Sequence, residues 1–229
     1  MDGFTRYALY FAPPPGPLAD FGAAWLGWDP RAGRRVAHIP MSGLPLPVSE
    51  ITAAPRKYGF HATLKPPFRL AAQFDVGELH NAAEALASSL APVLLDGLRV
   101  TGIGEFLALT PVGDQTRLAL LTARVVEALD IFRAPPDEAE LRRRRDAGLS
   151  ARQEELLKAW GYPHVMEEFR FHLTLTGRLP PQTRDTVKAR LDEMLEPLLP
   201  RPFRMREMSL FGEGQDGRFH LLNSYILSG

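Results

Sequence analysis

The chain contains no cysteine among its 229 residues. It can therefore form no disulfide, no cysteine-ligated zinc or iron–sulfur site, and no thiol nucleophile. An excess of charge is also absent, because 27 Lys and Arg residues balance 27 Asp and Glu residues. This balance removes the overall electrostatic attraction expected of a dedicated DNA or membrane-surface binder, although it is compatible with a local basic cleft.

Long apolar runs are missing as well. No uninterrupted apolar stretch approaches the ~18 residues that a membrane-spanning helix needs. Residues 1–6 lack the apolar segment of a signal peptide. We therefore expect a cytoplasmic protein that binds neither membrane nor DNA.

The residues that are present are those of an ordinary folded domain. The chain is 45% hydrophobic and 24% charged, and its 21 prolines predict stiff loops. At ~150 residues per domain, the length suits one large domain or two small lobes. We treat residues 1–229 as a single bilobal domain.

Local patterns predict two related halves. Asp75-x-x-Glu78 and Ser150-x-x-Gln153 are capping boxes that begin helices. Strand-rich and helix-rich segments follow one another in an order that indicates two α+β halves rather than regular βαβ alternation. In chain order we expect a strand at 7–11, a helix at 18–25, a strand at 58–65, a helix at 76–90, strands at 94–101, 106–110 and 117–121, helices at 122–132, 136–145 and 150–160, a strand at 169–176, a helix at 184–198, and strands at 203–211 and 218–227.

The sequence Phe-His-x-Thr-Leu occurs twice, at residues 60–64 and 171–175. Side chains alternate across a strand, so the apolar residues of each copy face the core and fix the register. Each copy then presents an imidazole and a hydroxyl side by side. The polar faces are expected to carry His61, Thr63 and Lys65 in the first copy and His172, Thr174 and Thr176 in the second.

This pairing suits phosphoester cleavage. A neutral imidazole can take a proton from the attacking oxygen, and an imidazolium can give one to the leaving oxygen. Threonine hydroxyls can donate hydrogen bonds to phosphate oxygens, and Lys65 can add positive charge. One His-x-Thr on a strand is commonplace, whereas two matching copies, one in each half, are far more specific. We predict that His61 and His172 are catalytic and that Thr63, Thr174 and Lys65 bind phosphate.

Other side chains are weaker candidates. The basic run at residues 142–145 follows glutamates at helical spacing, which favours a solvated helix face. One or two of Arg133, Arg142 and Arg143 can also reach a distal phosphate of the substrate. By strand alternation, at most one aromatic side chain of residues 7–10 faces the cleft. The candidates for substrate binding are Tyr58, Lys57, Arg133 and Arg143, with His164 a further candidate for lining the cleft.

The sequence gives little support for a metal or cofactor site or for a nucleotide-binding phosphate loop. No histidines or carboxylates stand at metal-ligand spacing, so we expect neither a metal nor another cofactor. A nucleotide-dependent ligase or transferase would need a glycine-rich phosphate loop, for which Gly102-x-Gly104 is too short.

The two His-x-Thr strands resemble those of the two-histidine (2H) phosphoesterase superfamily. That resemblance implies a bilobal α+β fold, in which two antiparallel sheets with flanking helices face a central cleft and each lobe contributes one motif. It also implies metal-independent action on cyclic phosphates or RNA ends. Longer strings resemble the branch found beside bacterial phosphonate-utilisation genes. Lys65 departs from the motif of the wider superfamily, which often ends in Ser, Thr or an apolar residue. These strings lie at residues 6–13, 55–68, 132–135, 160–163 and 169–177.

The predicted function is that of a metal-independent phosphodiesterase acting on a small cyclic phosphate or phosphonate-derived ester. An RNA end is a less favoured substrate. The alternative is a non-catalytic protein that binds nucleotides or RNA ends in the same cleft. Intact His and Thr in both motifs favour the enzyme, while the roles of base and acid stay open between His61 and His172.

Overall fold

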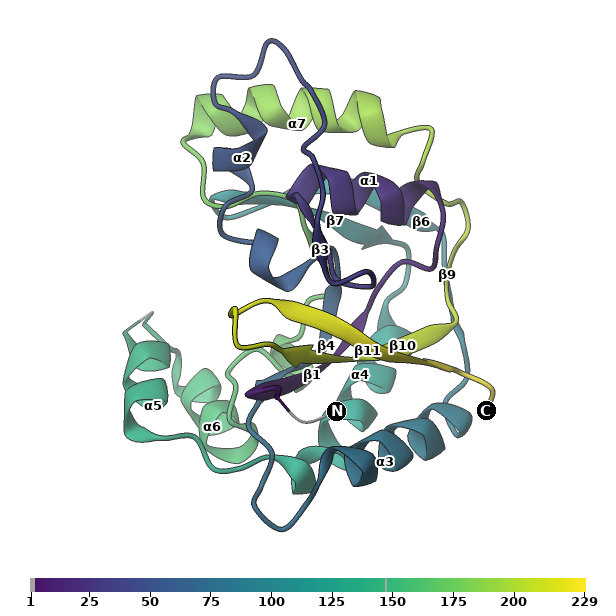
Figure 1. Cartoon of the computed structure of the whole chain (residues 1–229), viewed down its shortest axis with the longest axis vertical. Helices are drawn as coiled ribbons and strands as arrows, with labels where there is room; N and C mark the ends of the chain where they lie inside the picture. The colour runs from purple at the N-terminus through teal and green to yellow at the C-terminus, as the bar shows by residue number, and fades with distance from the viewer. Residues whose placement is uncertain (1–2, 147) are drawn as a thin grey trace.

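A computed structural model describes residues 3–146 and 148–229 of the chain (Figure 1). Seven of the eleven strands among the described residues form one sheet in the order β11-β10-β1-β4-β8-β7-β6, in which neighbouring strands are antiparallel. The other four form two small sheets, β2-β3 and β5-β9. The strands are β1 (Arg6–Phe11), β2 (Trp28–Asp29), β3 (Arg34–Arg35), β4 (Ala62–Phe68), β5 (Val93–Leu95), β6 (Gly97–Ile103), β7 (Phe106–Val112), β8 (Leu173–Thr174), β9 (Phe203–Met205), β10 (Glu207–Glu213) and β11 (Phe219–Ile226).

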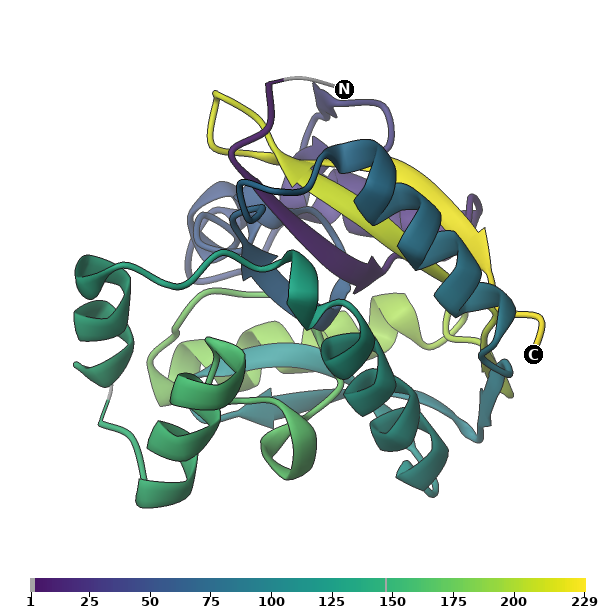
Figure 2. The ribbon, with the colours of Figure 1, turned by 90° about the horizontal axis from the view of Figure 1, so that it is seen from below.

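Helices flank this sheet on both halves. The α-helices are α1 (Pro17–Leu26), α2 (Val48–Ile51), α3 (Val76–Ser88), α4 (Thr116–Ala128), α5 (Glu138–Arg145), α6 (Ala151–Trp160) and α7 (Pro181–Leu195), and the 3₁₀ helices are η1 (Arg56–Tyr58), η2 (Asp130–Phe132) and η3 (Met166–Glu168). Helix α3 runs beside β10 and β11, and α7 lies against β6 and β7 (Figure 2). The expected α+β class is confirmed. Among the described residues, none of the helices has the length and apolar character that crossing a bilayer requires.

The two halves meet at the His-x-Thr strands. Strands β11, β10, β1 and β4 form one side of the sheet, and β8, β7 and β6 form the other. Ala62 of β4 pairs with Leu173 of β8, which joins the two expected sheets edge to edge into one. We call this junction the seam.

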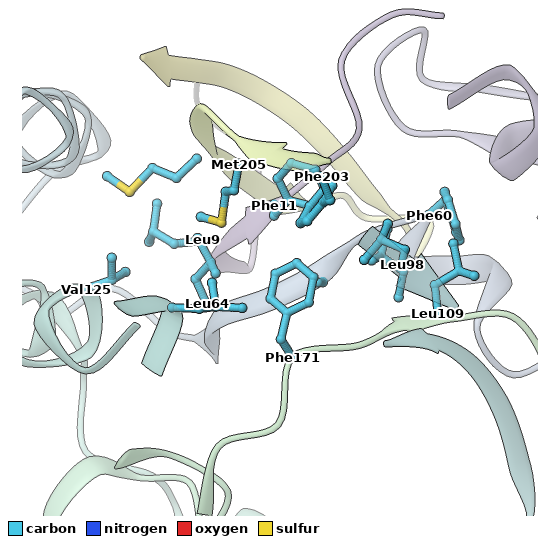
Figure 3. Close-up of a cluster of buried hydrophobic side chains, with 14 of the residues drawn as sticks. Leu9, Phe11, Phe60, Leu64, Leu98, Leu109, Val125, Phe171, Phe203 and Met205 are labelled. Atoms are coloured by element: carbon cyan, nitrogen blue, oxygen red, sulfur yellow. The ribbon is translucent and has the colours of Figure 1, made fainter. Parts of the chain in front are cut away.

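The core lies behind the seam. The apolar residues of both motifs are buried there, as strand alternation predicts: Phe60, Ala62 and Leu64 in the first, and Phe171, Leu173 and Leu175 in the second. Figure 3 shows residues of both halves in this core, with Phe171 close to Phe11 and Phe203. The ring centroid of Phe11 lies 5.9 Å from that of Phe171 and 5.4 Å from that of Phe203. A single hydrophobic core therefore supports both motifs.

Both predicted capping boxes are present. The side chain of Asp75 accepts a hydrogen bond from the backbone of Glu78, and Ser150 does the same for Gln153. The N-terminal backbone donors of α3 and α6 are thereby satisfied, which explains where these helices begin.

Several predicted boundaries were wrong. The strand expected at 117–121 is the first half of α4, because Leu118, Leu121 and Val125 form a helical stripe that packs into the core. The strand expected at 58–65 begins only at Ala62, after η1 and a turn at Gly59, whose φ is 74°. The segments expected at 94–101 and 203–211 are each divided in two, into β5 and β6 and into β9 and β10.

The second motif strand is also shorter than the predicted range 169–176, since β8 covers only Leu173–Thr174. Thr176 does not share the polar face with His172. It is buried, and its hydroxyl accepts a hydrogen bond from the backbone N–H of Leu107 at 2.9 Å. The strand ends where this contact turns the chain.

Candidate active site

The pairing at the seam brings the two motifs together. Because β4 and β8 are antiparallel around the Ala62–Leu173 pair, His61 stands across from Thr174 and Thr63 stands across from His172. All four side chains project from the face of the strands opposite the core. The site therefore has approximate twofold character, with one imidazole and one hydroxyl from each half.

Both imidazoles are held in the same way. The Nδ1 of His61 lies 3.0 Å from the carbonyl oxygen of Gly59, and the Nδ1 of His172 lies 2.7 Å from that of Arg170. A carbonyl oxygen can only accept, so Nδ1 is the donor in both rings. Neutral imidazoles held like this have an unprotonated Nε2, and the Oγ1 of Thr63 lies 3.3 Å from the Nε2 of His61.

Burial favours the neutral form of both imidazoles. The pKa of His61 is lowered to about 4, mainly by burial and to a smaller extent by His172, against the opposing effect of the hydrogen bond to Gly59. Burial also lowers the pKa of His172, opposed by the carbonyl of Arg170 and reinforced by His164. His61 is thus the more strongly neutral of the two.

Tyr10 of β1 supports the first imidazole. Its ring stacks on that of His61, with centroids 3.8 Å apart and an interplanar angle of 27°. The Tyr10 side chain is fully buried, and its hydroxyl has no hydrogen-bond partner. Tyr7 lies in the core on the other face of β1, so one aromatic residue of this strand lines the cleft, within the limit that alternation set.

Two hollows meet at the motif residues. The larger one, which we call the main cleft, has a volume of about 710 Å³ and is lined by His61, Thr63 and Thr174. The other, the side pocket, has a volume of about 500 Å³ and is lined by Thr63, His172 and His164 among others. Thr63, Pro66 and Tyr162 border both hollows, so the two hollows are neighbours. A ligand phosphate at the motif residues has room on either side.

Most of the predicted substrate-binding residues line the main cleft. Lys57 and Tyr58 come from η1, and Arg143 comes from α5. The Tyr58 ring stacks on Phe219, with centroids 5.2 Å apart, and the Nζ of Lys57 lies 4.8 Å from the centroid of the Tyr58 ring.

Lys65 and Arg133 do not reach the main cleft, contrary to the prediction. A register shift between β1 and β4 lies next to Lys65 and interrupts the alternation that would have aligned it with His61. Only 1% of Lys65 is exposed, and its Nζ donates to the Val126 carbonyl at 3.1 Å and to Asp130 at 3.0 Å. Arg133 donates two hydrogen bonds to the same Asp130 carboxylate, at 2.8 and 2.9 Å.

The sequence did not assign substrate binding to Arg6, Arg69, Arg144 or Tyr162, and it left open which aromatic residue of positions 7–10 lines the main cleft. Arg6 and Tyr10 lie on β1, Arg69 follows β4, Arg144 lies on α5, and Tyr162 follows α6. They share no motif and are spread along the chain, so only the fold brings them together. Among the described residues, there is no group of three or more His, Asp or Glu side chains that could hold a metal ion.

Comparison with known proteins gives two kinds of match. Residues 63–220 match a family described as "Protein of unknown function (DUF1045)". Two curated relatives are described as "Ribose 1,5-bisphosphate phosphokinase PhnN". The protein of Janthinobacterium sp. (strain Marseille) is 43% identical over 188 residues, which are 81% of this chain and 42% of the relative. That of Laribacter hongkongensis (strain HLHK9) is 41% identical over 182 residues, which are 76% of this chain and 40% of the relative. The chain thus spans about two fifths of the length of these relatives.

Among solved structures, TT0787 of Thermus thermophilus is similar with a TM-score of 0.45 and 16% identity, over 98% of both chains. LigT of E. coli in complex with NADP⁺ is similar with a TM-score of 0.45 and 13% identity, over 100% of both chains. A further similar structure, described as a phosphoesterase, has a TM-score of 0.43 and 13% identity over 99% of both chains.

Proposed function

The chain belongs to the DUF1045 family, and we propose that it is a metal-independent phosphodiesterase that uses His61 and His172 as its general base and general acid. The observation that carries this proposal is the seam, where two His-x-Thr motifs from different halves share one face. In both motifs a backbone carbonyl holds Nδ1, which leaves Nε2 as the nitrogen that exchanges a proton with substrate.

The different burial of the two rings supports a division of roles. His61 has the lower pKa and is neutral, so it serves as the base. Its Nε2 takes a proton from the attacking water as the water oxygen bonds to phosphorus. The bond from phosphorus to the leaving oxygen breaks, and the Nε2–H of a protonated His172 supplies the proton to that oxygen. A diester and one water thus become a phosphate monoester and an alcohol group.

The threonines stabilise the charge that develops in this step. The hydroxyls of Thr63 and Thr174 lie beside the imidazoles and can donate to the non-bridging oxygens of phosphorus. Lys65 has no part in this mechanism, because its ammonium group is buried against Asp130.

The substrate class that we propose is a small sugar phosphate or phosphonate-derived ester with a cyclic or otherwise activated phosphodiester. The names of the curated relatives refer to a phosphorylated ribose, which is chemistry of this class. The kinase activity in these names is not part of the function that we propose for this chain. The chain spans two fifths of the length of these relatives, and it has no Gly-x-x-x-x-Gly-Lys-Ser/Thr motif for nucleotide phosphates.

A substrate screen in the presence of EDTA tests the proposed function. The panel contains cyclic nucleotides, cyclic sugar phosphates and phosphonate esters, and release of the monoester is followed by ³¹P NMR. We expect at least one cyclic phosphodiester to be hydrolysed at a rate that EDTA leaves unchanged. A rate that chelation abolishes and a divalent cation restores would contradict the proposal. Binding of these compounds without turnover would instead favour the non-catalytic alternative.

The pH dependence of kcat/KM is expected to be bell-shaped with its maximum on the acid side of 6.5. The productive free enzyme has neutral His61 and protonated His172, so the maximum lies between two apparent pKa values that burial lowers, one of them to about 4. Above the higher value, activity falls because the acid loses its proton. Burial thus moves the profile below the neutral optimum that unperturbed histidines would give.

A bound phosphate anion favours imidazolium, so the profile of kcat should lie at higher pH than that of kcat/KM. Initial rates from pH 3.5 to 9 at low and at saturating substrate measure both. A maximum of kcat/KM above pH 7 would contradict the assigned protonation states.

A further inference from the structure

The main cleft contains hydrogen-bond donors that the protein itself leaves without acceptors. Three buried side-chain polar atoms among the described residues have no partner: the Tyr10 hydroxyl, the Arg144 Nε and one oxygen of Glu207. Tyr10 and Arg144 both line the main cleft. Buried donors in folded proteins are nearly always paired, so two unpaired donors in one cleft indicate a ligand rich in acceptors.

The charges of the main cleft indicate an anion. Arg6 pairs with Glu213 at 2.6 Å, and Arg69 pairs with Asp137 at 3.0 Å. Lys57 and Arg143 also line the cleft and are exposed, and among the described residues neither lies within 4 Å of a carboxylate, although Arg6 and, to a smaller extent, the charge of Lys57 lower the pKa of Glu213. The charge of Lys57 and Arg143 is available to a ligand.

These groups come from two elements, η1 and α5, and two of the groups contact tyrosine rings. Lys57 lies over the ring of Tyr58, and the Arg144 guanidinium carbon lies 4.7 Å from the ring centroid of Tyr162 while its Nη2 pairs with Glu140 at 2.6 Å. Tyr58 and Tyr162 both line the main cleft, as do the cations that contact them. Lys57 and Arg144 thus line one cleft, each against a tyrosine ring.

The motif residues do not need these cations. His61, Thr63, His172 and Thr174 already supply an acid, a base and two donors to a reacting phosphate. A single phosphate also fills only a small part of a cleft of about 710 Å³. The extra donors therefore fit a second acidic group of the same small molecule.

We propose that Lys57, Arg143 and Arg144 form a second anion subsite, which binds a phosphate monoester of the substrate at a distance from the reacting phosphodiester. This inference rests on the proposed function, since that function places the reacting group at the seam. Arginine suits such a site because its planar donors bind phosphate oxygens in pairs. The substrate class is thereby narrowed to small molecules with two phosphoryl groups, such as a sugar that carries a terminal phosphate as well as a cyclic one.

Binding of bisphosphates tests the second subsite without requiring turnover. The probes are alkane-α,ω-diol bisphosphates of increasing chain length and the matched alkanol monophosphates, titrated by calorimetry at ~0.15 M salt, where surface charges are screened beyond ~8 Å. For the wild type, the best bisphosphate should bind on the order of tenfold more tightly than its monophosphate, equivalent to ~1.4 kcal/mol. Lys57→Ala and Arg143→Ala should each reduce this advantage, and the double variant should abolish it.

Arg142→Ala is the matched control. It removes the same charge from the same helix at an exposed residue that does not line the main cleft. It should keep the full bisphosphate advantage. The inference is overturned if no chain length gives an advantage, or if Arg142→Ala removes as much of it as Arg143→Ala.

The two proposals can fail separately. Hydrolysis of a cyclic phosphodiester without any bisphosphate advantage would keep the proposed function and remove the second subsite. A bisphosphate advantage that Arg143→Ala abolishes, in a protein that hydrolyses none of the cyclic phosphodiesters, would keep the subsite and remove the proposed function.

Discussion

Replacing either His61 or His172 with alanine is expected to lower kcat/KM by about 10²–10⁴, the usual range for general acid–base catalysis. Alanine removes the Nε2 that takes or gives the proton but leaves the backbone carbonyls and the apolar side of each strand in place. Because the two imidazoles act in one step, the double variant should lose little more than the more severe single variant. Steady-state rates on the substrate found in the screen measure these losses.

Two kinds of variant serve as controls. Thr63→Val and Thr174→Val should lose less than the histidine variants, since each removes one hydrogen bond to phosphate. His80→Ala should keep its kcat/KM, because His80 lies on α3 and contacts Tyr225 and Asn223 rather than the main cleft. Thermal melts show whether each variant is folded. A double variant His61→Ala/His172→Ala with the wild-type rate would exclude the assigned roles.

Asp130→Ala is expected to lower the free energy of unfolding by about 3–5 kcal/mol, as is typical when one member of a buried ion pair is removed. The substitution leaves the ammonium of Lys65 in the core, where it is 1% exposed, with the Val126 carbonyl as its other hydrogen-bond partner. It also removes both hydrogen bonds from Arg133 to the carboxylate. Urea unfolding of the two proteins measures the difference.

Glu127→Ala is the matched control, because it removes a carboxylate from the exposed pair with Arg124, whose atoms are 3.8 Å apart. Such a pair contributes about 0–1 kcal/mol. Equal losses in the free energy of unfolding for Asp130→Ala and Glu127→Ala would contradict the structural role of the buried pair.

The variant Lys65→Met separates this structural role from a role in phosphate binding. Lys65→Met should bind phosphate with the affinity of the wild type. A loss of phosphate affinity as large as that of Thr63→Val would mean that Lys65 binds phosphate.

The sequence predicted the parts of the fold that depend on local chemistry. The capping boxes at Asp75 and Ser150 and the buried Phe, Ala and Leu of the two motifs follow from hydrogen bonds and alternation within a few residues. The strand predicted at 117–121 was wrong because a short apolar run does not distinguish a buried strand from the apolar face of a helix. Its helical stripe is evident only when Val125 is included.

The parts of the candidate site that were not predicted depend on contacts between distant segments. Alternation from His61 assigned Lys65 to the polar face, but the register shift against β1 and the carboxylate of Asp130 hold its ammonium in the core. Tyr10 lies 51 positions before His61 in the chain and stacks on it only because β1 and β4 are neighbours. No spacing rule connects such residues.

The unpaired hydroxyl of Tyr10 lowers the stability of the protein, and a ligand that accepts its hydrogen bond would offset this cost. A buried hydroxyl without a partner destabilises a fold by about 1–3 kcal/mol, and phenylalanine would occupy the same place without that cost. Selection for thermal stability alone would therefore replace this tyrosine. The tyrosine that carries this unpaired hydroxyl stacks directly on His61. A ligand that accepts this hydrogen bond would tighten the fold at the point where it binds, so that occupancy of the cleft and resistance to unfolding rise together.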